Sequence, residues 1–345
     1  MNVHTPPPPS ASQRRHGPLA GRVGTWALAL LRNRFYPGGL QVVAVAGLAL
    51  IVYLALTGTI RPARNIATMA TWTLWWAVLP WSFLVAGRVW CAICPLGAIS
   101  AWTQRAADLL GFGPKKRPGA TLKRVGPWLM VFTFVALAWV DRVFSIIGSP
   151  RATGALLLVL LGGAVLLGLL YRRRVWCRYL CPLGALSGVY AMTAALELRA
   201  DTTACHECRT KPCYTGNDER EGCPLYEFPQ TMDSNRNCTL CGECVKICPR
   251  NAIRISPRQP GRELWLLRRP LLAEATLGVV MVALVYLQTI DMTLPWGDYV
   301  KMVVENTPLQ SYNAVFSATF GAVIGLALSG YLVASWAAAR IGGIG

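Results

Sequence analysis

Long apolar runs alternate with charged loops along most of the chain. Six runs are long enough to cross the hydrocarbon core of a bilayer, which is about 30 Å thick. They cover residues 40–57, 66–86, 125–140, 152–171, 270–290 and 313–337. Asp141 and Arg142 cut the third run short, and we expect this helix to continue through residues 143–147. The pattern predicts a mainly α fold built on a six-helix transmembrane bundle.

Composition changes sharply at the ends of these runs. Residues 1–37 contain four consecutive prolines and several arginines, and they predict a disordered basic leader with a short amphipathic piece at 26–31. A cysteine-rich polar segment separates the fourth run from the fifth. The predicted parts are the leader at 1–37, four transmembrane helices at 38–190, a ferredoxin-like insert at 199–258, two more transmembrane helices at 268–337 and a tail at 338–345.

The basic residues are distributed unevenly between the two sets of loops. If the runs cross the membrane alternately, one set of loops carries only five of the 34 Lys and Arg residues. These five are Arg61, Arg64, Arg142, Arg151 and Lys301. Loops rich in Lys and Arg remain on the cytoplasmic side. We therefore expect a multi-pass protein of the bacterial inner membrane, in contact with lipid, with both termini and the insert in the cytoplasm.

Charge and histidine content exclude two classes of protein. A formal charge of +18 would suggest nucleic-acid binding in a soluble protein. Here the basic residues are scattered over the loops, and no nucleic-acid partner is predicted. The three histidines, His4, His16 and His206, all lie outside the apolar runs. An axial histidine pair for a membrane haem is therefore absent, and no haem is predicted.

Two of the loops repeat one another. Residues 88–100 read RVWCAICPLGAIS, and residues 174–187 read RVWCRYLCPLGALS. Each copy follows the second helix of a helix pair, so the chain contains two copies of a two-helix unit that ends in a Cys-Pro elbow. Pro and Gly can turn a chain without any further role. A turn does not require paired cysteines in both copies, and we favour a functional role for them.

The strongest chemical signal is the run Cys238-x2-Cys241-x2-Cys244-x3-Cys248-Pro249. In bacterial ferredoxins, three cysteines with this spacing hold one 4Fe–4S cluster and the fourth serves the neighbouring cluster. Grouped cysteines can also bind zinc. Zinc does not require this spacing, so the run predicts an iron–sulfur site.

A second set of cysteines departs from the ferredoxin spacing, with a gap of four residues between its second and third members. By the crossed rule, each cluster takes three cysteines from one set and one from the other. One cluster is then held by Cys205, Cys208, Cys213 and Cys248, and the other by Cys238, Cys241, Cys244 and Cys223. The long gap leaves sequential pairing of Cys205, Cys208, Cys213 and Cys223 open. Both arrangements use all eight cysteines and predict two 4Fe–4S clusters.

Four cysteines remain, two from each elbow. They are Cys91, Cys94, Cys177 and Cys181. Because 12 cysteines make three sets of four, the count allows a third iron–sulfur cluster that bridges the two elbows. The alternative is a pair of structural or redox-active dithiols. The symmetry of the repeat leads us to expect all four sulfur atoms at one site on the cytoplasmic side.

Paired helices with Cys-Pro elbows, followed by a double ferredoxin run, resemble the membrane polyferredoxins of the NapH, MauN and NosR types. The resemblance covers roughly residues 66–257. Cys177 and Cys181 match the CX3CP element of this family, whereas Cys91 and Cys94 depart from it because only two residues separate them. The two helices after the insert extend beyond the family pattern. The resemblance implies a quinol-linked electron carrier that serves a partner redox enzyme.

Three functions fit these features. The first is a conduit that relays electrons between the quinone pool, or a cytoplasmic donor, and a partner redox enzyme, as an electron-transfer subunit of the quinol dehydrogenase kind. The second is an assembly or reactivation factor that delivers electrons to a metalloenzyme during its maturation. The third, an iron sensor, has no DNA-binding helix pair to support it. Glu274 opens the fifth run, where it either complements the helix dipole or accepts a proton at a quinone site.

Overall fold

The computed structural model describes residues 18–114, 116–266 and 270–341. Among these residues, six helices are long and apolar enough to cross a membrane. They are α2 (Gly38–Thr57), the continuous segment from α3 to α4 (Ile66–Ala86), α7 (Ala120–Phe144), α8 (Pro150–Leu170), α15 (Leu272–Ile290) and α17 (Tyr312–Ile341). Each one overlaps a predicted span, which confirms the mainly α transmembrane fold. The second span is α3 (Ile66–Thr68), a π-helical stretch (Met69–Trp75) and α4 (Trp76–Ala86).

Helix α7 differs from its predicted span at both ends. It begins at Ala120, and Ser145 ends it in a left-handed backbone conformation with a φ of 49°. The carboxylate of Asp141 accepts a hydrogen bond from the amide of Ile147 at 3.0 Å, and this bond fixes the turn that follows. The expectation that the helix continues through residue 147 is therefore wrong, because Asp141 stabilises the turn.

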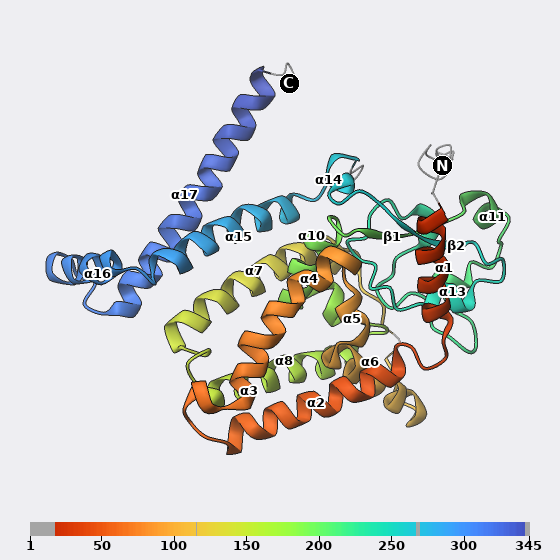
Figure 1. Cartoon of the computed structure of the whole chain (residues 1–345), viewed down its shortest axis with the longest axis horizontal. Coiled ribbons are helices and arrows are strands. Elements are labelled where there is room, and N and C mark those ends of the chain that lie inside the picture. Colours follow the sequence, from red (N-terminus) through yellow and green to blue (C-terminus); the bar gives the residue numbers. More distant parts are fainter. Residues whose placement is uncertain (1–17, 115, 267–269, 342–345) are drawn as a thin grey trace.

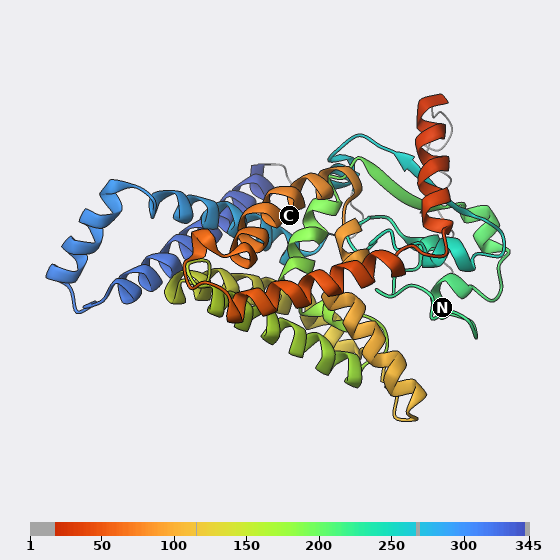
Figure 2. The ribbon, with the colours of Figure 1, turned by 60° about the horizontal axis from the view of Figure 1, so that its bottom comes forward.

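The membrane helices lie on one side of the molecule and the cysteine-rich insert lies on the other (Figures 1 and 2). Helix α2 packs against α8, and α7 packs against α15. The first half of α17 packs through Phe316 and Phe320, whereas its second half diverges from the other helices (Figure 1). Between α15 and α17, the structure adds a helix that the sequence did not predict, α16 (Leu294–Asn306), whose buried Trp296 contacts Phe316.

Four shorter helices build the two elbows. They are α5 (Val89–Ile93), α6 (Pro95–Leu109), α9 (Val175–Tyr179) and α10 (Pro182–Ala191). Pro95 and Pro182 are the first residues of α6 and α10, a position where the missing proline N–H costs no helical hydrogen bond. Cys94 and Cys181 therefore occupy the break between the two helices of each elbow.

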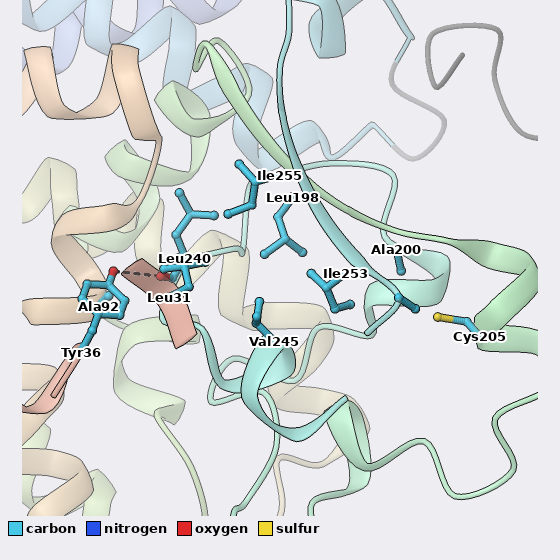
Figure 3. Packing of buried hydrophobic residues seen from close by; sticks show 11 residues of the cluster. Leu31, Tyr36, Ala92, Leu198, Ala200, Cys205, Leu240, Val245, Ile253 and Ile255 are labelled. Atoms are coloured by element: carbon cyan, nitrogen blue, oxygen red, sulfur yellow. Dashed lines mark hydrogen bonds between the residues drawn. The ribbon is translucent and has the colours of Figure 1, made fainter. Parts of the chain in front are cut away.

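A short antiparallel ribbon closes the insert. Strands β1 (Leu196–Ala200) and β2 (Ile253–Pro257) pair so that Leu198 faces Ile255. The segments between the strands are α11 (Thr202–His206), α12 (Pro212–Thr215), the 3-10 turn η4 (Pro229–Thr231) and α13 (Glu243–Ile247), and α14 (Arg262–Leu266) follows β2. Figure 3 shows Leu198 and Ile255 in one apolar cluster, with Cys205 at its edge. Pairing of the two strands brings both ends of the insert to the same place.

The N-terminal segment is not the disordered leader that the sequence suggested. Residues Pro18–Arg32 form helix α1, which packs against β2 and α13. Leu31 and Tyr36 are buried in the apolar cluster of the insert, and the hydroxyl of Tyr36 donates to the carbonyl of Leu240 at 2.8 Å (Figure 3). The expectation of disorder is wrong for residues 18–37, because apolar side chains of this segment complete the core of the insert. Residues 1–17 lie outside the described part of the chain.

Substitution of Gly242 is expected to loosen helix α1. Gly242 has a φ of 79°, and a Cβ atom there would lie 2.6 Å from the carbonyl oxygen of Leu31. Gly242→Ala should therefore cost about 1–2 kcal/mol in backbone strain alone and should speed trypsin cleavage at Arg22. Gly278→Ala is the matched control, since its Cβ would meet open space. An unchanged cleavage rate in Gly242→Ala would show that α1 is not held by this contact.

Candidate metal centres

The first set of four thiols surrounds a small cavity in the insert. Its lining includes all four cysteines with apolar neighbours: Cys205, Cys208, Cys213, Cys248, Pro212, Phe228, Pro249 and Ile253. Burial first, and then the nearby thiols of Cys205, Cys248 and Cys208, raise the pKa of Cys213 to about 11. Cys248 therefore lies with the three cysteines that precede it by more than thirty residues, as the crossed rule requires.

The second set gathers around the loop between η4 and α13. Burial is the largest cause that raises the pKa of Cys223 to about 12, and both Cys241 and Cys238 contribute. Cys244 has a raised pKa for the same reasons, burial first and then the thiols of Cys238, Cys241 and Cys223. Cys223 thus lies with the three later cysteines and not with the first set.

Backbone amides point at the sulfur atoms of both sets. The amide of Glu227 donates to Cys223 Sγ at 3.3 Å, and the amide of Ala252 donates to Cys248 Sγ at 3.3 Å. In the second set, Leu240 and Gly242 have positive φ angles, and backbone hydrogen bonds from Leu240 and Glu243 act on Cys238 and Cys241. Amides arranged in this way stabilise thiolates and are typical of iron–sulfur sites.

The two elbows meet at one place. Cys94, Cys177 and Cys181 pack in one apolar cluster. The pKa of the Cys181 thiol is raised mainly by burial and then by Cys177, Cys94 and Cys91, so the cysteines of both elbows act on one another. Burial likewise raises the pKa of Cys177 to about 12, which Arg174 opposes. The site brings together residues from the segments between α4 and α6 and between α8 and α10.

Two buried arginines make reciprocal contacts between the elbows. Arg88 opens the first repeat and donates to the carbonyl of Cys177 in the second at 3.1 Å. Arg174 opens the second repeat and donates to the carbonyl of Cys91 in the first at 3.0 Å. Each arginine therefore contacts the first cysteine of the opposite repeat. The equivalent glycines of the two copies lie at this interface, since a Cβ on Gly97 would be 3.4 Å from Cys177 Sγ.

The positive charges of these arginines are buried beside the thiols. Arg88 is 1% exposed and Arg174 is 7% exposed. Their hydrogen bonds go to backbone carbonyls, so these bonds do not supply a negative charge. Burying a cation is costly unless an anion compensates it. A thiolate-bound iron–sulfur cluster is anionic, so this environment fits a cluster at the elbows.

The three cysteine sets are adjacent in a fixed order. Cys94, Cys181 and Cys223 all pack against one apolar cluster, so the elbow site adjoins the second set. Arg174 lowers the pKa of Cys241 as well as that of Cys177, although burial raises both more strongly. Cys213 of the first set acts on Cys244 of the second. The order from the membrane helices outward is the elbow site, the second set and then the first set.

The donor sets fit iron–sulfur clusters. Among the described residues, no three Cys, His, Asp or Glu side chains converge on a site for a single metal ion. A cubane does not need such convergence, because each of its four irons takes a separate outside ligand. The apolar surroundings, the amide donors and the buried arginines are all features that an anionic thiolate cluster requires.

Sequence reasoning found the 12 cysteines but missed the two arginines that hold the elbows together. Arg88 and Arg174 occupy the first position of the repeated RVWC sequence, so the repeat itself contained the signal. The amide donors could not be predicted from the sequence, since their positions depend on backbone angles that the sequence does not specify.

Two family models match the chain, and both are described as a 4Fe–4S binding domain. One matches residues 68–118 and 153–195, which contain the elbow cysteines, and the other matches residues 234–254. The elbow segments are therefore similar to iron–sulfur domains in their own right. No solved structure matches the chain.

Several proteins of known name are similar to half or more of the chain. Ferredoxin-type protein NapH of Escherichia coli is 28% identical over 202 residues, which cover 51% of this chain and 64% of that protein. An uncharacterized protein of Methanocaldococcus jannaschii is 30% identical over 50% of this chain and 65% of its own length. The chain thus spans just under two thirds of these relatives. Methylamine utilization ferredoxin-type protein MauN of Methylorubrum extorquens is 25% identical over 67% of this chain and 68% of its own.

Proposed function

Because the chain belongs to the 4Fe–4S ferredoxin-type membrane electron-transfer proteins of the NapH/MauN type, we propose that it relays electrons between the quinone pool and a partner redox enzyme. One observation carries this proposal. Three sets of four cysteines follow one another from the membrane helices to the outer end of the insert. Such a series connects a membrane-soluble donor or acceptor with a protein at the other end.

Each set has a proposed cluster. Cys205, Cys208, Cys213 and Cys248 would hold the first, and Cys223, Cys238, Cys241 and Cys244 the second. Cys91, Cys94, Cys177 and Cys181 would hold a third at the elbows, supported by the buried arginines and by the match of these segments to a 4Fe–4S binding domain. Bound clusters would supply one-electron transfer. The protein supplies the thiolates, the amide donors and the apolar surroundings that tune the reduction potential.

The experiment that tests the function uses the whole chain, purified anaerobically and placed in lipid nanodiscs. Addition of a short-tailed benzoquinol or naphthoquinol should bleach the visible absorption of the clusters and produce the EPR signal of reduced 4Fe–4S centres. Dithionite serves as the positive control, since it reduces clusters without a quinone site. Clusters that dithionite reduces and that neither quinol reduces would contradict coupling to the quinone pool.

Both termini and the insert are proposed to lie in the cytoplasm, on the basis of the uneven distribution of basic residues. Reporter fusions after Pro62, Ile146 and Val300 should behave as periplasmic, and a fusion after Pro118 as cytoplasmic. The fusion after Val300 is the most informative of the four, because Val300 lies in α16 between the last two membrane helices. A cytoplasmic result there would mean that α15 does not cross the membrane.

A further inference from the structure

A cavity of about 480 Å³ lies between the membrane helices and the insert, apart from the cysteine sites. Helices α7, α10 and α15 form its walls, and the elbow at α9 and the loops of the insert cover it. Its size lies within the range of small-molecule sites in proteins. The cavity contains none of the 12 cysteines in its lining.

The cavity is lined by apolar and by polar side chains. Met130, Val131, Ala185 and Leu277 belong to one apolar cluster that joins α7, α10 and α15, and they line the cavity. The lining also contains cations and hydroxyl groups, namely Arg88, Lys123, Arg178, Arg236, Tyr179 and Tyr226. A ligand that matches both kinds of lining combines a polar ring with an apolar tail.

Glu274 of α15 is the carboxylate of this cavity. It pairs with Arg236 at 2.9 Å, and its side chain is 19% exposed. Arg88 and Arg178 also lie close enough to act on its charge. The carbonyl of Arg236 accepts from Arg88 Nη1 at 2.9 Å, and Arg88 Nη2 in turn contacts the carbonyl of Cys177. The carboxylate is thus connected by two arginines to the elbow cysteines.

The same wall brings the cavity close to two cysteine sets. Arg236 and Asn237 directly precede Cys238 of the second set, and Gly184 lies between the cavity and the elbow, with its Cβ position 3.4 Å from Cys181 Cβ. Arg88, which is 1% exposed, also has a buried Nε without a partner among the described residues. An oxygen atom of a ligand in the cavity would give this N–H an acceptor.

We propose that this cavity is the site where a membrane-soluble quinol binds, and that Glu274 accepts its protons; the proposal rests on the function proposed above. Oxidation of one quinol breaks its two O–H bonds and gives quinone, two electrons and two protons. Clusters held by the cysteine sets beside the cavity would accept the electrons. The protons pass one after the other to the Glu274 carboxylate and then to solvent. Arg236 is a positioning residue that holds the carboxylate at the cavity through their ion pair.

An anionic lipid headgroup fits the cavity less well than a quinol. The arginines that line it already donate to acceptors in the protein: Arg173 to the carbonyl of Tyr214, Arg178 to Glu227, and Arg236 to Glu274. These three arginines therefore have acceptors within the protein and do not need a phosphate to compensate them. A neutral ring needs only one or two donors and a proton acceptor, and the cavity provides both.

Variants at two positions, Glu274 and Met130, separate binding from proton transfer. Glu274→Gln keeps the size of the side chain but cannot accept a proton, so it should slow quinol-driven cluster reduction at least tenfold while binding of the oxidised benzoquinone stays within twofold. Glu274→Asp should restore part of the rate. Met130→Trp places a larger side chain in the apolar lining of the cavity and should weaken quinone binding at least tenfold. Binding is measured by quenching of tryptophan fluorescence in protein whose iron has been removed, and again in the loaded protein.

The matched controls lie on α16 and in the turn before it. Glu305→Gln and Met292→Trp change an exposed carboxylate and an exposed methionine far from the cavity, and both should leave binding and rate unchanged. The rate of the native chain should fall as the pH is lowered and Glu274 is protonated, and this dependence should be absent in Glu274→Gln. Wild-type rates and binding in Glu274→Gln and Met130→Trp would overturn the site and leave the proposed function standing. A native chain that quinol cannot reduce would overturn the proposed function.

Discussion

Replacement of Cys177 by alanine is expected to lower the iron content of the anaerobically purified protein from about 12 to about eight atoms per chain, since a cubane holds four irons. Cys177 lies at the centre of the elbow site, where it is buried and close to the other three thiols. A 4Fe–4S cluster held by three protein ligands in an otherwise buried site is open to loss of iron. The clusters of the insert use none of the elbow cysteines and should remain.

Ser187→Ala provides the control for this measurement. Ser187 Oγ lies 3.6 Å from Cys91 Sγ, so the substitution disturbs the elbow without removing a proposed ligand. It should keep all the iron. If Cys177→Ala also keeps about 12 irons, or if the native chain binds only about eight, the elbow cysteines are not cluster ligands. The reciprocal contacts of Arg88 and Arg174 would then serve only to join the two repeats.

The transmembrane part could be predicted closely because its signal is strong. Every residue of a membrane span must be apolar or paired, so runs of bilayer length are unambiguous in sequence. The ends of α7 were predicted less well, because they depend on a hydrogen bond from the amide of Ile147 to Asp141. Such local caps are decided by a few atoms, and hydropathy does not report them.

Helix α1 shows the other kind of failure. Its segment is rich in arginine and follows a run of prolines, which is typical of disordered chains. Leu31 and Tyr36 nevertheless become buried because they cover apolar side chains of β2 and of the loop at Leu240. Folding of this segment is driven by a partner surface more than two hundred residues away. A local reading of composition cannot detect such a surface.

The candidate sites also differ in how far they could be predicted from local sequence. Spacing alone predicted the eight cysteines of the insert, because the ferredoxin run is a local pattern. The meeting of the two elbows followed from their repeat, since equivalent segments of related copies come together near the axis. The cavity around Glu274 was not predictable, because its walls come from α7, α10 and α15 and its cover comes from the insert. Only the carboxylate itself was visible in the sequence.

The pairing of the eight insert cysteines leads to a prediction that iron counts alone can decide. In the structure, Cys248 lies with Cys213, and Cys223 lies with Cys241. The double variant Cys213→Ala/Cys248→Ala should therefore remove one cluster, about four irons, and be no worse than either single variant. The double variant Cys213→Ala/Cys223→Ala should remove two clusters, about eight irons. Sequential pairing reverses both results, because Cys213 and Cys223 would then share a cluster and Cys213 and Cys248 would not. EPR of the dithionite-reduced variants provides a second readout, since magnetic coupling between the two clusters of the insert should disappear in each of the three single variants, Cys213→Ala, Cys223→Ala and Cys248→Ala. Loss of about eight irons from the double variant Cys213→Ala/Cys248→Ala would contradict the crossed arrangement.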